Sequence, residues 1–324
     1  MDASCTVVVE VYDFAPLHAA QWFYILLSIA SVVLVIYTAL RYLNRIIFQD
    51  VTKELIMILY AFISIYSLVF MLTQLIQIFF RYTAKEKCDA QVPKVLCVLR
   101  YVPSSMTSAF LIMHMGITAQ HAMSTFGFGF RSQKIAARFT YCFSLVYSVA
   151  LGTLAFWNEP LQGRTAYCAG ITASSSGILI PNLYVFLALD ILNALASLLL
   201  WKYNHHRLYN ENTFELEISF RRRQNLYAMQ QFSPIATFQA VLYIIFILSI
   251  YFSQLYKSSM SNNWFLLATL AANVFPFYCF FCPLIFIVLI RNGRFKRVSH
   301  VNNLINSAQQ SDQVYFAALS VQWK

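Results

Sequence analysis

The chain has 324 residues and a formal net charge of +10, and 59% of its residues are hydrophobic whereas only 11% are charged. A mean hydropathy of +0.60, with 29 Phe and 20 Tyr, exceeds what a water-facing surface can hide. These values exclude an ordinary soluble domain and predict a protein whose solvent is lipid.

Seven apolar windows follow one another along the chain. An α-helix needs about 20 apolar residues to cross the hydrocarbon core of a bilayer. The connectors between the windows are short, so we predict one all-α domain over residues 1–324, a bundle of seven transmembrane helices. The predicted spans are 19–40, 54–80, 97–123, 135–157, 180–201, 234–255 and 265–290.

The first window does not have the pattern of a cleaved signal peptide. The residues before it include Asp2, Glu10 and Asp13 but no Lys or Arg, and the window exceeds the usual apolar core of such a peptide. We therefore expect it to be the first span.

Basic residues predict the orientation. Most of the 23 Lys and Arg residues fall in alternate segments, which places the N-terminus outside and the C-terminus in the cytoplasm, although the basic segment 81–94 falls on the outer side. Because the positive charge is divided among loops, no nucleic-acid partner is expected. Tryptophans at the predicted span ends fit interfacial anchors: Trp22, Trp157, Trp201 and Trp264.

Four cysteines lie in or beside the predicted outer segments: Cys5, Cys88, Cys97 and Cys168. Disulfides form in the secretory pathway, and four cysteines allow three connectivities. We favour Cys97 with Cys168, which would join the start of span three to the second outer loop, and Cys5 with Cys88. No pair has zinc-finger spacing, so neither a metal nor a cofactor is expected.

Polar residues inside predicted spans are candidates for ligand binding, because they are costly in lipid. Asp190 in span five needs a partner, for which His114 in span three is a candidate, and a structural polar network is the alternative role. Nearer the outside, aromatic and polar residues are suited to line a small-molecule pocket: Arg100, Tyr101, Ser104, Ser105, Asn182, Tyr184 and Trp264.

Span seven contains Pro276 and Pro283, which remove backbone hydrogen bonds and predict either a hinge or a fixed kink. The cytoplasmic tail 291–324 places apolar residues near one helical face among basic residues, as an interfacial helix would.

The connector between spans five and six, FELEISFRRRQNLYAMQQFSP at 214–234, is unusually charged. Its first half alternates apolar and polar residues as a strand does, and its second half suits a helix. Arg221, Arg222 and Arg223 either anchor span six at the headgroups or form a docking surface for a cytoplasmic partner, and the two roles can coexist.

Three local patterns resemble the nematode serpentine chemoreceptors of the Sra superfamily, with class alpha/beta as the nearest class. Cys88-Asp89, Cys97 and Arg100 resemble that family's approach to span three. Gln120-His121-Ala122-Met123-Ser124-Thr125 stands where the family has E-R-x-x-A-T. Leu216, Phe220 and Asn225 match parts of the family's L-S-x-R-Y-Q-x-x-E-N.

This resemblance implies a G-protein-coupled receptor in the plasma membrane of a sensory neuron, with an external small-molecule ligand and a heterotrimeric G protein as partners. The residues assigned to G-protein coupling are Gln120, His121, Arg221, Arg222, Arg223 and Asn225. Gln120 and His121 cannot form the family's ion pair. Either His121 becomes charged and substitutes for it, or another contact holds the resting state, or coupling is weak. No special role for His121 is a further alternative.

Enzymes are disfavoured, because the chain has no H-E-x-x-H, no G-x-S-x-G and no Gly-rich phosphate loop. The alternative to a receptor is a transporter or channel, since carriers also use broken helices and an intramembrane carboxylate. Seven spans do not divide into two equal halves, which favours the receptor.

Overall fold

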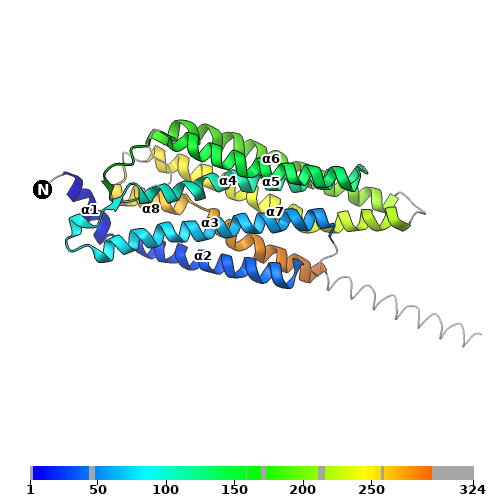
Figure 1. Ribbon diagram of the computed structural model, residues 1–324, viewed down its shortest axis with the longest axis horizontal. Coiled ribbons are helices and arrows are strands. Elements are labelled where there is room, and N and C mark those ends of the chain that lie inside the picture. The colour runs from blue at the N-terminus through cyan, green and yellow to red at the C-terminus, as the bar shows by residue number, and fades with distance from the viewer. Residues whose placement is uncertain are drawn as a thin grey trace, which may run out of the picture.

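The computed structural model describes residues 3–43, 48–157, 159–168, 173–210, 216–256 and 259–293. The long helices lie side by side along one axis and form an elongated bundle (Figure 1). The α-helices of the described residues are α1 (Ala3–Asp13), α2 (Ala15–Arg41), α3 (Asp50–Thr83), α4 (Tyr101–Thr125), α5 (Phe130–Phe156), α6 (Ala173–Asn210), α7 (Leu216–Leu255) and α8 (Asn262–Ala272), followed by helical residues 275–293. The short α1 lies at one end of the bundle (Figure 1).

Among these described residues, seven helical segments are long and apolar enough to cross a membrane. This confirms the predicted all-α bundle of seven spans. The remaining regular structure is short: the 3-10 helices η2 (Lys87–Asp89) and η3 (Leu96–Arg100), and the strands β1 (Val92–Pro93) and β2 (Arg164–Thr165). These elements lie near α1, at the end of the bundle that we call the disulfide end (Figure 1).

The surface along the bundle is apolar. Large hydrophobic side chains such as Leu40, Phe139, Val146 and Leu199 are exposed, whereas hydroxyl groups along the spans donate to the carbonyl four residues earlier, as Ser31 does to Leu27. An apolar exterior with internally satisfied polar groups is what lipid requires.

The sequence left open where the strand-like alternation in the connector 214–234 gives way to helix, and the described residues 216–234 are all helical. α7 begins at Leu216, so residues 216–220 are helical, while residues 211–215 and the side chain of Arg221 lie outside the described part of the chain. Extending an existing helix satisfies backbone groups within the chain, whereas a strand would need a partner.

The last span is interrupted next to a proline. α8 ends at Ala272, Asn273 and Val274 are not helical, and the helix resumes at Phe275 just before Pro276. Proline has no N–H and is tolerated in the first turn of a helix, and Pro276 is the second residue of the resumed helix, so the break lies directly before the proline. Pro283 lies within the uninterrupted helical residues 275–293.

α4 and α5 approach closely because small residues line their contact. Ser108 and Ser148 form a hydrogen bond of 2.9 Å between their hydroxyls, and the hydroxyl of Ser144 donates to the carbonyl of Ala109 at 3.3 Å. A Cβ at Gly116 would lie 2.9 Å from Cβ of Thr140 and still closer to the rest of that side chain. Close helix packing through small residues is typical of membrane bundles.

Replacing Gly116 with alanine is therefore expected to destabilise the bundle by about 1–3 kcal/mol, because α4 and α5 must separate. Gly177→Ala in α6 is the matched control, since a Cβ there meets no atom within 4 Å. The midpoint of thermal denaturation of detergent-purified protein should fall for the first variant only. An equal effect of both changes would contradict the packing argument.

Candidate functional site

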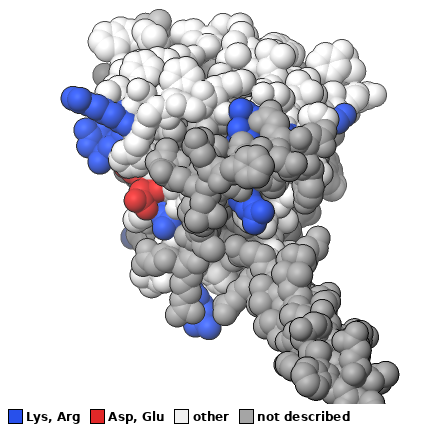
Figure 2. Space-filling view, turned by 90° about the vertical axis from the view of Figure 1, so that its right-hand side faces the viewer, with Lys and Arg blue, Asp and Glu red and all other residues white. Residues whose placement is uncertain are grey.

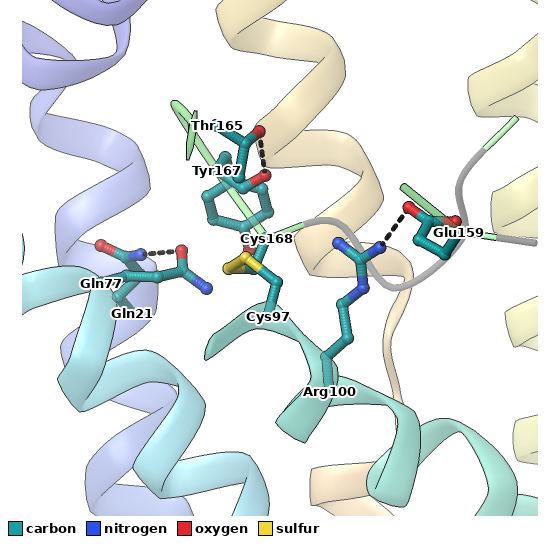
Figure 3. Close-up of a disulfide and its surroundings, with 8 residues drawn as sticks. All are labelled: Gln21, Gln77, Cys97, Arg100, Glu159, Thr165, Tyr167 and Cys168. Carbon is teal, nitrogen blue, oxygen red and sulfur yellow. Dashed lines mark hydrogen bonds and ion pairs between the residues drawn. A yellow bond between two sulfur atoms is a disulfide. The ribbon is translucent and has the colours of Figure 1, made fainter. Parts of the chain in front are cut away.

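At the disulfide end, β1 and β2 come from different connectors, and a disulfide lies beside this pair of short strands (Figure 3). A disulfide joins Cys97 in η3 to Cys168, three residues after the end of β2, with the two Cα atoms 5.3 Å apart. The two strands pair antiparallel, and Val92 lies opposite Thr165. This is the cysteine pair favoured from the sequence, and it holds the segment after β2 against the start of α4.

The second predicted disulfide cannot be followed to both of its ends. Cys88 in η2 is disulfide-bonded, but the side chain of its predicted partner, Cys5, lies outside the described residues. An ion pair links the same elements: Nζ of Lys87 lies 2.6 Å from a carboxylate oxygen of Asp13, at the end of α1. η2 is thereby tied to α1.

Arg100, the last residue of η3, is buried beside the disulfide. Its Nη2 donates to Oε1 of Glu159 at 3.3 Å, and the two side chains are 10% and 12% exposed. Figure 3 shows the guanidinium and the carboxylate facing each other. Cζ of the Arg100 guanidinium lies 5.2 Å from the centre of the Tyr101 ring. A buried charge needs such a partner, so the pair fixes the loop before β2 over the helices.

Tyr167 completes this region from the segment between β2 and Cys168. Its carbonyl accepts a hydrogen bond of 3.2 Å from the hydroxyl of Thr165, and burial raises the pKa of its own hydroxyl above the usual value. The Tyr167 side chain is thus neutral and lies beside the disulfide.

Beside the disulfide lies a partly open cavity of about 170 Å³. It is bounded by α3, η3, α4, α6, α7 and α8, together with the segment after β2. Its lining is mainly aromatic and aliphatic with a few polar groups, the usual composition of a small-molecule site. The lining residues are Tyr66, Phe70, Thr73, Gln74, Arg100, Pro103, Ser104, Thr107, Tyr167, Cys168, Leu179, Leu183, Phe246, Ile250, Ser253, Gln254, Phe265, Leu266, Thr269, Leu270, Ala272, Asn273 and Phe275.

Of the residues predicted to bind a ligand, Arg100 and Ser104 line this cavity. The others are not part of its lining: Tyr101, Ser105, Asn182, Tyr184, Asp190 and Trp264.

Helical phase explains why the predicted residues of α4 diverge. Tyr101 stacks on Phe156 of α5, and Ser105 lies against Gly152 of the same helix. Both therefore face α5, whereas Arg100 and Ser104, which share another face, point to the cavity. Sequence alone locates residues along a span but does not give the direction of each neighbour.

The remaining outer residues are used elsewhere. Asn182 donates to its own helix at Ile178 and accepts from the hydroxyl of Tyr147 at 3.4 Å. Tyr184 is 51% exposed on the outside of the bundle. The ring of Trp264 packs edge-on against that of Phe14, which precedes α2.

The sequence analysis missed several polar lining residues, notably Thr73 and Gln74 on α3, Ser253 and Gln254 on α7, and Thr269 on α8. The available signal was the presence of polar residues in the part of each span nearest the disulfide end. Gln74 is buried, and its Oε1 has no hydrogen-bond partner among the residues that the structure describes.

Asp190 and His114 have different partners from those suggested by the sequence. Oδ1 of Asp190 accepts from Nε2 of Gln239 on α7 at 3.4 Å. Nε2 of His114 lies 2.6 Å from the hydroxyl of Tyr278 in the last helix. Both side chains are fully buried, so they link α6 to α7 and α4 to residues 275–293 in the middle of the bundle.

At the end opposite the disulfide, an uncharged polar network joins three helices. Nδ1 of His121 on α4 lies 2.9 Å from Oδ1 of Asn225 on α7, and Nδ2 of Asn225 donates to Oγ1 of Thr125 at 2.9 Å. Nδ2 of Asn204 on α6 donates to the same oxygen at 2.7 Å. We call these four residues the inner network. The predicted coupling residues His121 and Asn225 are thus in direct contact.

Gln120 belongs to a neighbouring cluster. Its Oε1 accepts from the hydroxyl of Thr52 on α3 at 3.0 Å, and its Nε2 donates to Gln49 at 2.9 Å and to Gln133 on α5 at 3.3 Å. The side chain is 2% exposed. Gln120 therefore ties α3, α4 and α5 together and is not available for a partner in this conformation.

The same end has a basic surface (Figure 2). Exposed basic residues there include Arg41, Arg131, Arg138 and Arg223. The described side chains of α7 begin with Arg222 and Arg223, which lie less than one helical turn before Asn225. The predicted interfacial helix of the tail lies outside the described residues.

No candidate metal centre is found in the parts of the chain that the structure describes: no three His, Cys, Asp or Glu residues are grouped there as ligands would be.

Fold and site together define a multi-pass membrane protein of seven helices, with a disulfide-capped cavity at one end and an uncharged polar network at the other. The model of the family described as serpentine type 7TM GPCR chemoreceptor Sra matches residues 3–323. The chain belongs to this family, which is a family of receptors rather than of enzymes.

Curated relatives agree with the family match. The chain is 22% identical to serpentine receptor class alpha-2 of Caenorhabditis elegans over 93% of this chain and 92% of that protein. It is 21% identical to class alpha-1 over 95% and 96% of the two chains. For class alpha-6 the identity is 21% over 67% of this chain, which spans 66% of that receptor. These relatives are named as class alpha, whereas the sequence resemblance pointed to class alpha/beta of the same superfamily.

Proposed function

We propose that the chain is a G-protein-coupled chemosensory receptor that binds an external small molecule. Its N-terminus and disulfide end face outward and its basic end faces the cytoplasm, in the plasma membrane of a sensory neuron. The family and the distribution of basic residues support this orientation.

The observation that carries the proposal is the cavity of about 170 Å³ beside the disulfide between Cys97 and Cys168. It touches η3 through Arg100, α4 through Ser104, α7 through Phe246 and α8 through Thr269. A ligand bound there contacts helices that continue to the opposite end of the bundle. It can therefore favour one arrangement of their inner ends over another, provided that its affinity for the two arrangements differs.

At the inner end, the network of His121, Thr125, Asn204 and Asn225 supplies contacts that such a change would break. It occupies the place where an arginine-based ion pair is expected in the family. The break before Pro276 supplies a point in the last span where helix bending is cheap. In the active arrangement a heterotrimeric G protein would bind the opened basic face.

Expression with a promiscuous G protein tests this proposal. Cells displaying an N-terminally tagged receptor should give calcium responses to external small molecules, and a G-protein inhibitor should abolish them. A ligand-linked ionic current that survives the inhibitor would instead support the transporter or channel alternative.

Neutralising Arg221, Arg222 and Arg223 together to glutamine is expected to reduce ligand-stimulated signalling while leaving surface display intact. The physical reason is that three cations at the start of α7 offer an electrostatic surface to an anionic partner. Surface labelling and calcium responses should be measured in the same cells. Loss of surface delivery would show that the triplet acts only as a topology signal. Arg131→Gln, Lys134→Gln and Arg138→Gln together on α5 remove the same number of charges and provide the charge-matched comparison.

A further inference from the structure

The size of the cavity restricts its ligand. An apolar protein cavity of about 150 Å³ accommodates benzene. The cavity beside the disulfide measures about 170 Å³, so a molecule of roughly six to ten non-hydrogen atoms fits without movement of the helices. A peptide or a large amphiphile would extend beyond the cavity.

Charge restricts the ligand further. Among the described lining residues Arg100 alone is charged, and Glu159 already neutralises it at 3.3 Å. A ligand ion would enter a largely apolar site without a free counter-charge and would lose its hydration shell. An uncharged ligand avoids that cost.

Two lining side chains define where a polar group would be met. Gln74 on α3 has a buried Oε1, and Arg100 has a buried Nε, and neither atom has a hydrogen-bond partner in the described structure. The first is an acceptor and the second a donor. Both residues line the cavity, and the elements that carry them, α3 and η3, pack against each other. A hydroxyl group both donates and accepts, which matches this pair of needs.

We propose that the cavity binds a small, uncharged, mainly apolar alcohol or phenol, whose hydroxyl group is met by Gln74 and Arg100 and whose hydrocarbon part lies against Phe70, Phe246 and Phe265. This inference rests on the proposed receptor function and narrows its ligand class.

Direct binding to the full chain, purified in detergent, tests the inference without a G protein. The probes are phenol, benzyl alcohol, cyclohexanol and 3-methyl-1-butanol. Toluene, benzoate and benzylamine share the benzyl skeleton but lack the hydroxyl or carry a charge. At least one alcohol or phenol should raise the midpoint of thermal denaturation in a saturable manner, and the charged analogues should not.

Two pairs of variants locate the site. Thr269→Phe fills the cavity and should abolish the ligand-induced shift, whereas Thr153→Phe on the exposed face of α5 should preserve it. The pair is matched because each threonine hydroxyl donates to the carbonyl four residues earlier. Gln74→Leu should weaken affinity about tenfold or more, because the ligand hydroxyl loses its acceptor. Gln77→Leu, on the same helix but outside the lining, should preserve affinity.

The outcomes separate this inference from the receptor proposal. It is overturned if none of the alcohols and phenol shifts the denaturation midpoint, or if the shift survives Thr269→Phe, or if benzoate or benzylamine binds in its place. External signalling that is insensitive to Thr269→Phe would likewise overturn it while leaving the receptor proposal standing. Cavity binding without any G-protein signal would support the ligand class and contradict the proposed receptor function.

Discussion

Serine in place of Cys97 is expected to lower the free energy of unfolding by about 4 kcal/mol and to remove most of the receptor from the cell surface. The disulfide closes a loop between residues separated by 71 positions, and cross-linking a loop of this size restricts the unfolded chain strongly. Cys168→Ser should have the same effect, and the double variant should be no worse than either single one, because all three remove the same bond.

The matched control is Cys142→Ser, which replaces an exposed free cysteine on α5. Thermal denaturation in detergent and surface labelling of the N-terminal tag would measure the effect. The fraction that still folds should respond less to ligand, since Tyr167 and Cys168 line the cavity and the bond holds them there. Equal stability of the Cys97 and Cys142 variants would contradict a structural role for the bond.

The helices could be predicted because lipid imposes a simple rule. A span must be apolar for about 20 residues, and every backbone group must be satisfied within it, so composition alone reveals the number of spans. The break before Pro276 also follows from one residue. By contrast, the alternation at 216–220 was too short to outweigh the helix that continues from it.

The site was predicted less well, because it depends on the rotation of each helix about its axis. Arg100 and Ser104 are four residues apart and share one face of the chain, and both line the cavity. Tyr101 and Ser105 lie one position further along and face α5 instead. Gln74 was missed for the same reason: its position in span two was visible, but the neighbour that it faces depends on the packing of α3 against η3 and α4.

The inner network could not be foreseen as a unit. His121 and Asn225 were each singled out by resemblance to a family motif, but they are separated by more than 100 positions in the chain. The network also includes Asn204, which donates to Thr125 and which no motif indicated. What the sequence did predict is that Gln120 and His121 cannot form an ion pair, and the structure accordingly has neutral hydrogen bonds at this place.

Asn225→Ala is expected to raise ligand-independent signalling about tenfold, because it removes contacts that hold α7 to α4 at the inner end. The variant loses the interactions of Asn225 with Nδ1 and the carbonyl of His121 and with Oγ1 of Thr125. Each hydrogen bond of this kind contributes about 1 kcal/mol net. If about 1.4 kcal/mol of that sum is specific to the resting arrangement, the active population rises tenfold.

His121→Ala should have the same sign, and the double variant should signal little more than the stronger single variant, since both remove the hydrogen bond between the side chains of His121 and Asn225. Asn182→Ala on α6 is the control: it also loses an asparagine with hydrogen-bond partners, but at the disulfide end. Basal G-protein signalling normalised to surface display measures the effect. If Asn225→Ala leaves both basal signalling and ligand potency unchanged, the inner network does not hold the resting state. If basal signalling rises for Asn225→Ala but not for Asn182→Ala, an uncharged network performs in this chain the task that an arginine-based ion pair would perform elsewhere in the family.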